Sequence, residues 1–156
     1  MTLSGLKTTG VFFILFFLDL FRPFGYYLNI EFLFLGVIFL CLSKKFKLAF
    51  FLSFFFGGLK DFVISYPDSR ILSLFEYPAL CLVAYYFLSY SFFADKRKYA
   101  LIFRNLLALI LISLHAIINS IVIESGSLSF FFAFVAQSFI AFFAVDYLFT
   151  ENEANI

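Results

Sequence analysis

Residues 48–65, with the sequence LAFFLSFFFGGLKDFVIS, form an apolar run that contains two adjacent charges, Lys60 and Asp61. A helix that crosses a membrane needs about 20 mainly apolar residues, and an ionisable side chain near the bilayer centre costs about 2.5–3.5 kcal/mol on insertion scales. Charged residues in such a run seldom face lipid. Two interpretations stay open: Lys60 snorkels to the interface while Asp61 caps or pairs locally, or the pair has a function inside the membrane.

Small and polar residues recur every four positions in this run and again in the last apolar run of the chain. On a helix this period places them on one face, where they allow close helix packing or the approach of a partner's helix. The first stripe consists of Ala49, Ser53, Gly57 and Asp61, with Gly58 beside it, and the second consists of Ser129, Ala133, Gln137 and Ala141.

The composition decides the class of protein. The chain has 156 residues, of which 64% are hydrophobic and 13% charged, and its mean hydropathy is +1.05. A soluble fold of this length cannot enclose that much apolar surface, so we expect an integral membrane protein. The formal net charge of +1 excludes a strongly basic nucleic-acid-binding protein.

Six apolar runs predict a single all-α transmembrane domain that covers residues 1–156. The first run is similar to a signal peptide but lacks a small-residue cleavage site, so we expect a retained helix. The start of the fourth run is ambiguous: its helix begins near residue 71, or it begins at Pro78 and residues 71–77 lie along the interface. The predicted spans are residues 9–22, 27–43, 48–65, 71–93, 101–123 and 128–149.

The basic residues set the expected orientation. Short loops rich in lysine and arginine stay in the cytoplasm, and the two basic clusters of this chain alternate correctly for a bundle of six transmembrane helices. Both termini are therefore expected to be cytoplasmic. The clusters are Lys44, Lys45 and Lys47 after the second run, and Lys96, Arg97 and Lys98 after the fourth.

In this orientation most polar residues of the spans lie toward the outer leaflet, where they form an expected polar outer-leaflet cluster. Such a cluster could hold a small ligand, receive a partner's helix or lock the bundle through internal ion pairs. Its predicted members are Asp19, Arg22, Glu31, Lys60, Asp61 and Asn119.

The sequence lacks the residue patterns of common catalytic sites. It contains one histidine, His115, and no HExxH, GxSxG, GxxxxGK[ST] or GxGxxG motif. His115 lies one turn before Asn119 and is expected to bond to a neighbouring helix. Cys41 and Cys81 have no CxxC spacing and indicate neither a metal site nor a redox pair. We therefore expect no enzyme activity, no cofactor and no metal.

A further pattern covers residues 29–90 and joins the features described above. An acidic residue enters the second run, a basic turn follows, and the third run ends with a glycine followed four residues later by an aspartate. The residues that carry the pattern are Asn29, Ile30, Glu31, Phe32, Lys44, Lys45, Gly57, Gly58, Leu59, Lys60, Asp61, Phe62, Pro67, Leu72, Tyr77 and Tyr85.

This pattern resembles the MreD family of rod-shape-determining membrane proteins. The family commonly has a proline and an aspartate where this chain has Ile30 and Glu31, and often a glycine where Ser69 or Arg70 stands. The resemblance implies a non-enzymatic scaffold in the bacterial cytoplasmic membrane that serves cell elongation. It also implies an MreC-like single-span partner, linked to MreB-like filaments inside and to peptidoglycan synthases outside.

Two alternatives have the same size and topology. The chain is similar to the substrate-binding membrane subunit of energy-coupling-factor vitamin transporters, in which the polar outer-leaflet cluster would bind a vitamin. That family docks through alanines spaced four apart in its first helix, and residues 11–18 of this chain contain no alanine. The other alternative is a structural membrane protein with no ligand.

Overall fold

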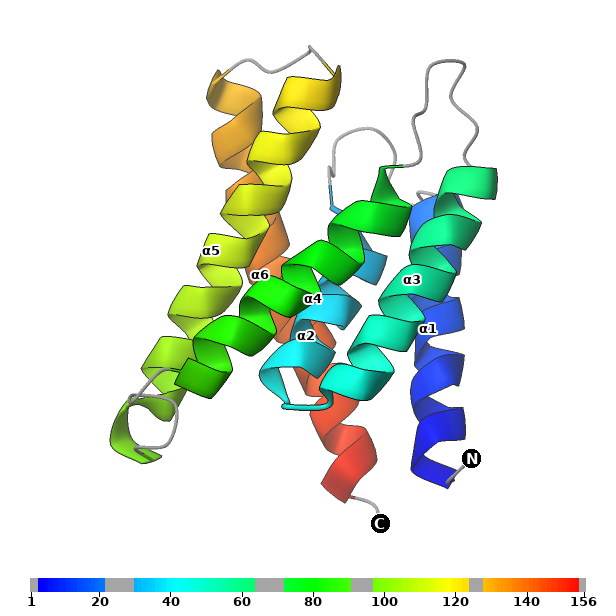
Figure 1. Ribbon diagram of the computed structural model, residues 1–156, viewed down its shortest axis with the longest axis vertical. Coiled ribbons are helices and arrows are strands. Elements are labelled where there is room, and N and C mark those ends of the chain that lie inside the picture. Colours follow the sequence, from blue (N-terminus) through cyan, green and yellow to red (C-terminus); the bar gives the residue numbers. More distant parts are fainter. Residues whose placement is uncertain (1–2, 22–29, 64–71, 91–96, 124–127, 155–156) are drawn as a thin grey trace.

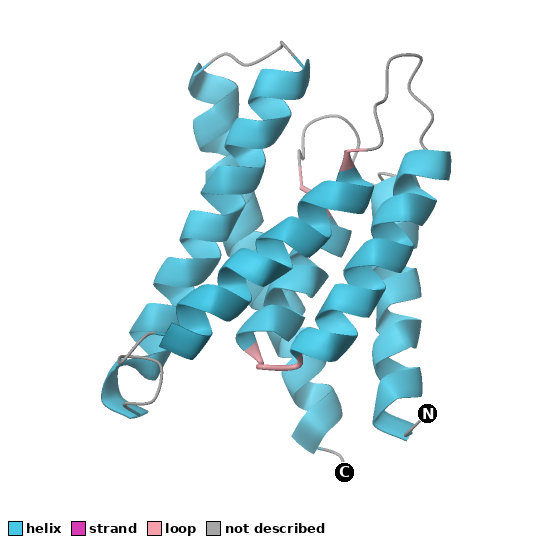
Figure 2. Ribbon diagram, viewed as in Figure 1, coloured by secondary structure: helices cyan, strands magenta, loops and turns pink. Residues whose placement is uncertain are grey.

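The computed structural model describes residues 3–21, 30–63, 72–90, 97–123 and 128–154. All regular secondary structure within these ranges is helical (Figure 2), which confirms the predicted all-α class for this part of the chain. One helix lies in each of the six apolar runs. They are α1 (Leu3–Phe21), α2 (Phe32–Leu42), α3 (Phe46–Val63), α4 (Ser73–Tyr90), α5 (Arg97–Ile123) and α6 (Leu128–Ala154).

The shortest helix, α2, is the centre of the bundle. Every residue from Leu33 to Leu42 is buried, and α2 contacts each of the other helices. A helix that is apolar on all sides is stable only when it is covered on all sides, which explains the central position of this sequence. The helix is shorter than the predicted span of 27–43, because the described residues Ile30 and Glu31 precede it without being helical.

Both ends of α2 are fixed by specific hydrogen bonds. At the beginning, the Asp19 carboxylate of α1 accepts the backbone N–H groups of Phe32 and Leu33 at 2.7 and 3.0 Å. At the end, the Lys45 N–H donates to the Leu40 carbonyl and the Lys44 N–H donates to the Cys41 carbonyl. Lys44 has a φ of 59°, so the helix ends in a Schellman motif with lysine at the left-handed position that glycine usually occupies.

The following hairpin, α3 and α4, is packed most closely where α4 begins. A Cβ atom on Gly57 would lie 2.5 Å from the backbone oxygen of Ser73, so the two helices approach to a distance that a side chain would prevent. The first turn of α4 includes residues before Pro78, which resolves the two starts left open by the sequence: the helix begins at Ser73 and contains Pro78 in its interior.

The helices alternate in direction along the bundle. Figure 1 shows the beginning of α1, the end of α6, the turn between α2 and α3, and the beginning of α5 at the same end of the bundle. The two basic clusters thus share one end. Lys96 lies outside the described residues, and Arg97 and Lys98 form the start of α5.

One stretch of the described helices, Ile102–Ile121 in α5, is long and apolar enough by length and composition to cross a membrane. Shorter apolar stretches are Phe32–Leu42 and Phe131–Val145. This finding supports association with a membrane only weakly, since core helices of soluble proteins can pass the same test.

Candidate functional site

A buried polar network joins the ends of α2, α3, α4 and α5, and the carboxylate of Glu31 is its centre. Oxygen Oε2 of Glu31 accepts hydrogen bonds from Lys60 Nζ at 2.6 Å and from the Tyr77 hydroxyl at 2.7 Å. Lys60 Nζ also donates to the Tyr77 oxygen at 2.8 Å. One carboxylate oxygen thus binds side chains from α3 and α4, and the ion pair is largely withdrawn from the surface.

The imidazole of His115 extends this network to α5. Its Nδ1 lies 2.6 Å from Glu76 Oε1, and its Nε2 lies 3.2 Å from Glu31 Oε2. An imidazole can donate from both nitrogens only when it is protonated. With a protonated His115, two cations, Lys60 and His115, balance two anions, Glu31 and Glu76, and the network carries no net charge.

Aromatic rings cover part of this ion-paired group. The Phe34 ring stacks on His115 with 3.9 Å between ring centroids, and the Phe134 ring lies 5.7 Å away. The Lys60 ammonium group lies 5.4 Å from the centroid of the Tyr77 ring. Because the surroundings have a low dielectric constant, the attraction within the network is strong and an unpaired member would be costly.

Asn119 completes the network on α5, one turn after the histidine. Its amide nitrogen is placed 3.0 Å from His115 Nε2. The two ends of an asparagine amide are assigned by their hydrogen bonds. If the amide is turned by 180°, its oxygen accepts from the protonated imidazole, which is the orientation that a doubly protonated His115 requires.

The two aspartates of the predicted cluster have a different role from Glu31. Asp19 caps the start of α2, and Asp61 Oδ2 accepts the backbone N–H of Leu74 at 2.8 Å, in the first turn of α4. Within the described residues, the adjacent side chains of Lys60 and Asp61 therefore have different partners: Lys60 binds the side chains of Glu31 and Tyr77, whereas Asp61 binds a backbone N–H group of α4. Asp61 thus caps a helix, as one of the two interpretations expected, and Lys60 is bound by Glu31 inside the bundle.

The structure thus brings together three of the predicted cluster residues, Glu31, Lys60 and Asn119, while Asp19 and Asp61 bind backbone groups nearby. Arg22 lies outside the described residues. Sequence reasoning did not include three further members in the cluster: Glu76, Tyr77 and His115. A signal existed, because Glu76 and His115 are ionisable residues in apolar runs that the predicted topology places at the same end as Lys60.

The small-residue stripe of α3 packs inside the chain itself. Ala49, Ser53 and Gly57 are buried, and a Cβ on Gly58 would meet the Leu74 side chain at 3.0 Å. This face of α3, which the sequence offers for a partner's helix, is buried inside the bundle, and α4 covers it at Gly57 and Gly58.

The stripe of α6 is only in part a packing face. Ala141 is buried and Gln137 is half-buried, but Ala133 is exposed, and the side chain of Ser129 lies outside the described part of the chain. Larger side chains provide the buried face of α6. They include Phe134, Ser138, Phe142 and Val145.

The two cysteines meet although they are far apart in sequence. The Sγ atoms of Cys41 in α2 and Cys81 in α4 lie 2.9 Å apart and are buried. Sequence spacing could not indicate this contact, since it depends on the packing of two helices.

The chemistry of the buried polar network is mutual neutralisation. Donors and acceptors from four elements bind one another, and the geometry fixes the relative positions of α2, α3, α4 and α5. Comparisons with known proteins give no further indication: the chain matches no protein-family model, no curated protein and no solved structure.

Proposed function

We propose that the chain is a multi-pass protein of the bacterial cytoplasmic membrane, with six spans and both termini in the cytoplasm. The support is the distribution of side chains, in which charged groups lie inside the bundle and apolar groups lie on its surface. Glu76 and His115 are buried, whereas phenylalanines of α3 point outward, with Phe51 66% exposed. An exposed apolar surface around a charged interior suits lipid as the surrounding solvent.

Within that membrane we propose a scaffolding role in cell elongation, with an MreC-like single-span protein as the direct partner. The observation that carries this proposal is the buried polar network, in which ion pairs and hydrogen bonds fix four helices relative to one another. A scaffold needs such a fixed arrangement. The resemblance to the MreD family supplies the partner and the link to MreB-like filaments and peptidoglycan synthases.

We place the partner's helix against α6 rather than α3, because the small residues of the α3 stripe are buried inside the bundle. On the exposed side of α6, Ala133 and Ala136 are small. Small side chains let two membrane helices approach closely enough for backbone contacts. We therefore assign the partner contact to the part of α6 around Ala133.

The transporter alternative would use the same polar groups to bind a vitamin. Glu31, Lys60 and Tyr77 instead bind one another at 2.6–2.8 Å. A ligand would have to break these bonds before it could form its own. This geometry favours the scaffold over the substrate-binding subunit.

The test is co-purification of the gently solubilised, tagged protein from its native membrane, followed by identification of stoichiometric partners. Recovery of a single-span protein with a periplasmic coiled coil supports the proposal. Recovery of ATP-binding cassette subunits instead would replace it with the transporter function. A reporter fused after Ile156 should be cytoplasmic, and a periplasmic reporter would overturn the topology.

Two matched variants locate the partner contact. Ala133→Phe adds a large ring to the exposed side of α6 and should abolish recovery of the partner. Ile117→Phe changes an exposed residue of α5 and should leave recovery unchanged. Equal recovery with both variants would remove α6 from the partner interface.

A further inference from the structure

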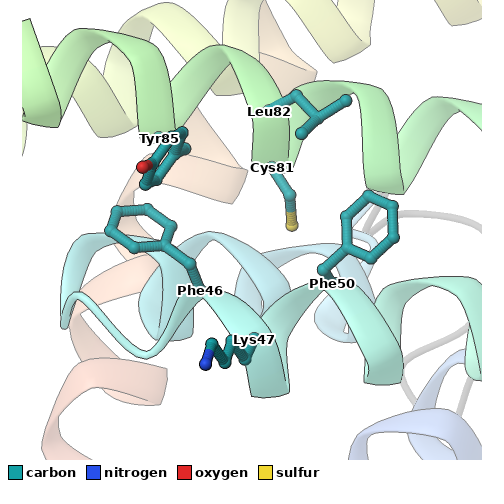
Figure 3. A pocket seen from close by; sticks show the side chains of 6 residues that line it. All are labelled: Phe46, Lys47, Phe50, Cys81, Leu82 and Tyr85. Carbon is teal, nitrogen blue, oxygen red and sulfur yellow. The ribbon is translucent and has the colours of Figure 1, made fainter.

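A groove lies between α3 and α4 on the side of the bundle where the two helices diverge. It has a volume of about 350 Å³ and is lined by side chains from both helices. Figure 3 shows the Cys81 thiol between the helices, with aromatic and aliphatic side chains on either side of it. The lining residues are Phe46, Lys47 and Phe50 of α3, and Cys81, Leu82 and Tyr85 of α4.

The two ends of this α3–α4 groove differ. Near the start of α3, the Phe46 and Tyr85 rings meet edge to face with 4.8 Å between their centroids, which closes that end. One turn further along α3 the walls are Phe50 and Leu82, which are 42% and 57% exposed. The part of the groove between Phe50 and Leu82 is therefore open to the surroundings of the bundle.

A positive charge lies beside the α3 wall of the groove, where Figure 3 shows Lys47 on the side of α3 that faces away from α4. Lys47 is exposed and is the one charged residue among the six that line the groove. The turn before α3 adds Lys44 and Lys45 at the same end of the bundle. An apolar groove with a cationic side chain beside one wall matches the polarity of a lipid, in which a hydrocarbon chain is joined to an anionic headgroup.

We propose that the α3–α4 groove binds an anionic phospholipid of the inner leaflet, with one acyl chain between Phe50 and Leu82 and the headgroup phosphate at Lys47. This inference rests on the proposed location in the membrane. A volume of about 350 Å³ is at the small end of the roughly 300–1,000 Å³ of small-molecule sites, which suits one stretch of acyl chain. Lysine binds phosphate as a point charge, and basic residues near the surface attract anionic lipid.

The test uses tryptophan fluorescence, because the chain contains no tryptophan. Phe54→Trp places a reporter one turn beyond Phe50, and Phe143→Trp places a control on α6; the native residues are 52% and 47% exposed. Each variant is reconstituted in phosphatidylcholine nanodiscs that contain a small fraction of brominated phosphatidylglycerol or brominated phosphatidylcholine. Bromine atoms quench a tryptophan that they contact.

In Phe54→Trp we expect brominated phosphatidylglycerol to quench the tryptophan about fivefold more effectively than brominated phosphatidylcholine does. This is the ratio that about 1 kcal/mol from one lysine contact provides. The control Phe143→Trp should be quenched equally by both lipids. Adding Lys47→Gln should abolish the preference, whereas Lys7→Gln, an exposed lysine of α1 at the same end, should not. Leu82→Trp repeats the measurement from the opposite wall.

Equal quenching by the two lipids at both walls of the groove would overturn the site. A preference that survives Lys47→Gln would also overturn it, because the phosphate would then lie elsewhere. If neither lipid quenches any of these tryptophans, both the proposed location in the membrane and the proposed lipid site are overturned. The control variant separates these results, since bulk lipid reaches Phe143→Trp whenever the protein is embedded.

Discussion

Asp19 in α1 and Asp61 in α3 perform the same task, because each accepts a backbone N–H from the residue 13 positions later, at the start of the next helix. An aspartate near the end of one helix thus caps the N-terminus of the next helix. A carboxylate at a helix N-terminus satisfies free N–H groups and interacts favourably with the helix dipole. The hairpins α1–α2 and α3–α4 are tied in the same manner.

Removal of these caps should destabilise the bundle unequally. Asp19 is buried and binds two N–H groups, so Asp19→Ala should lower the free energy of unfolding by about 2 kcal/mol, the upper end for a cap. Asp61→Ala removes one bond from a half-buried position and should cost about 1 kcal/mol. Unfolding by sodium dodecyl sulfate in mixed micelles, followed by circular dichroism, measures both. A larger effect of Asp61→Ala would contradict the assignment of Asp19 as the stronger cap.

Adjacent glycines in α3 should respond differently to the same added methyl group. In Gly57→Ala the new Cβ meets the Ser73 backbone at 2.5 Å, so the hairpin must open; we expect a loss of about 1–3 kcal/mol, as in overpacked cores. In Gly58→Ala the nearest atom, at 3.0 Å, belongs to the Leu74 side chain, which can move. Thermal unfolding in detergent compares the two. Equal melting temperatures would exclude close packing at Gly57.

In the ion pair at the centre of the network, loss of Glu31 should destabilise the protein more than loss of Lys60. Glu31→Leu leaves the half-buried Lys60 cation with the Tyr77 hydroxyl as its hydrogen-bond partner, and should cost about 3 kcal/mol, the lower end for a broken buried pair. Lys60→Met leaves Glu31 with Tyr77 and His115, and should cost less. The double variant should cost less than the sum of the two. Additive effects in this double-mutant cycle would show that the two side chains do not interact.

His115 should be more important for stability than its neighbour on the same face of α5. His115→Leu removes the partner of the buried Glu76 carboxylate, whereas His115→Gln keeps one donor and should be milder. Asn119→Ala removes a half-buried amide and should cost at most about 1 kcal/mol. Urea unfolding in detergent ranks the three variants. If Asn119→Ala were the most harmful, the bridge between Glu76 and Glu31 would not be the main role of this face.

The helices could be predicted from the sequence because each apolar run is separated from the next by charges, proline or glycine. The central position of α2 was not predicted. Its 11 residues are apolar on every side, so no face indicates a neighbour, and only tertiary packing decides that it is surrounded. Tertiary packing also decides which face of α6 is buried: a period of four suggested a packing face that includes Ala133, but Ala133 is exposed.

The polar network was predicted in part. Lys60 and Glu31 were recognised because charge within an apolar run requires a partner. Glu76, Tyr77 and His115 were not included, since the choice of partner depends on how α4 and α5 are rotated about their axes. Asp19 and Asp61 have the same charge as Glu31, yet they bind backbone groups. The sequence does not distinguish these roles, because the difference lies in which helix terminus is within reach.

The central position of α2 also has a consequence for biosynthesis. Of the helices that it contacts, α6 is the last to leave the ribosome. Until then, the surface of α2 that packs against α6 stays uncovered, and the four helices α1, α3, α4 and α5 must retain the short helix. A chain that stops before α6 would thus leave part of its central helix uncovered. The core of the bundle is therefore complete only once α6 has been made.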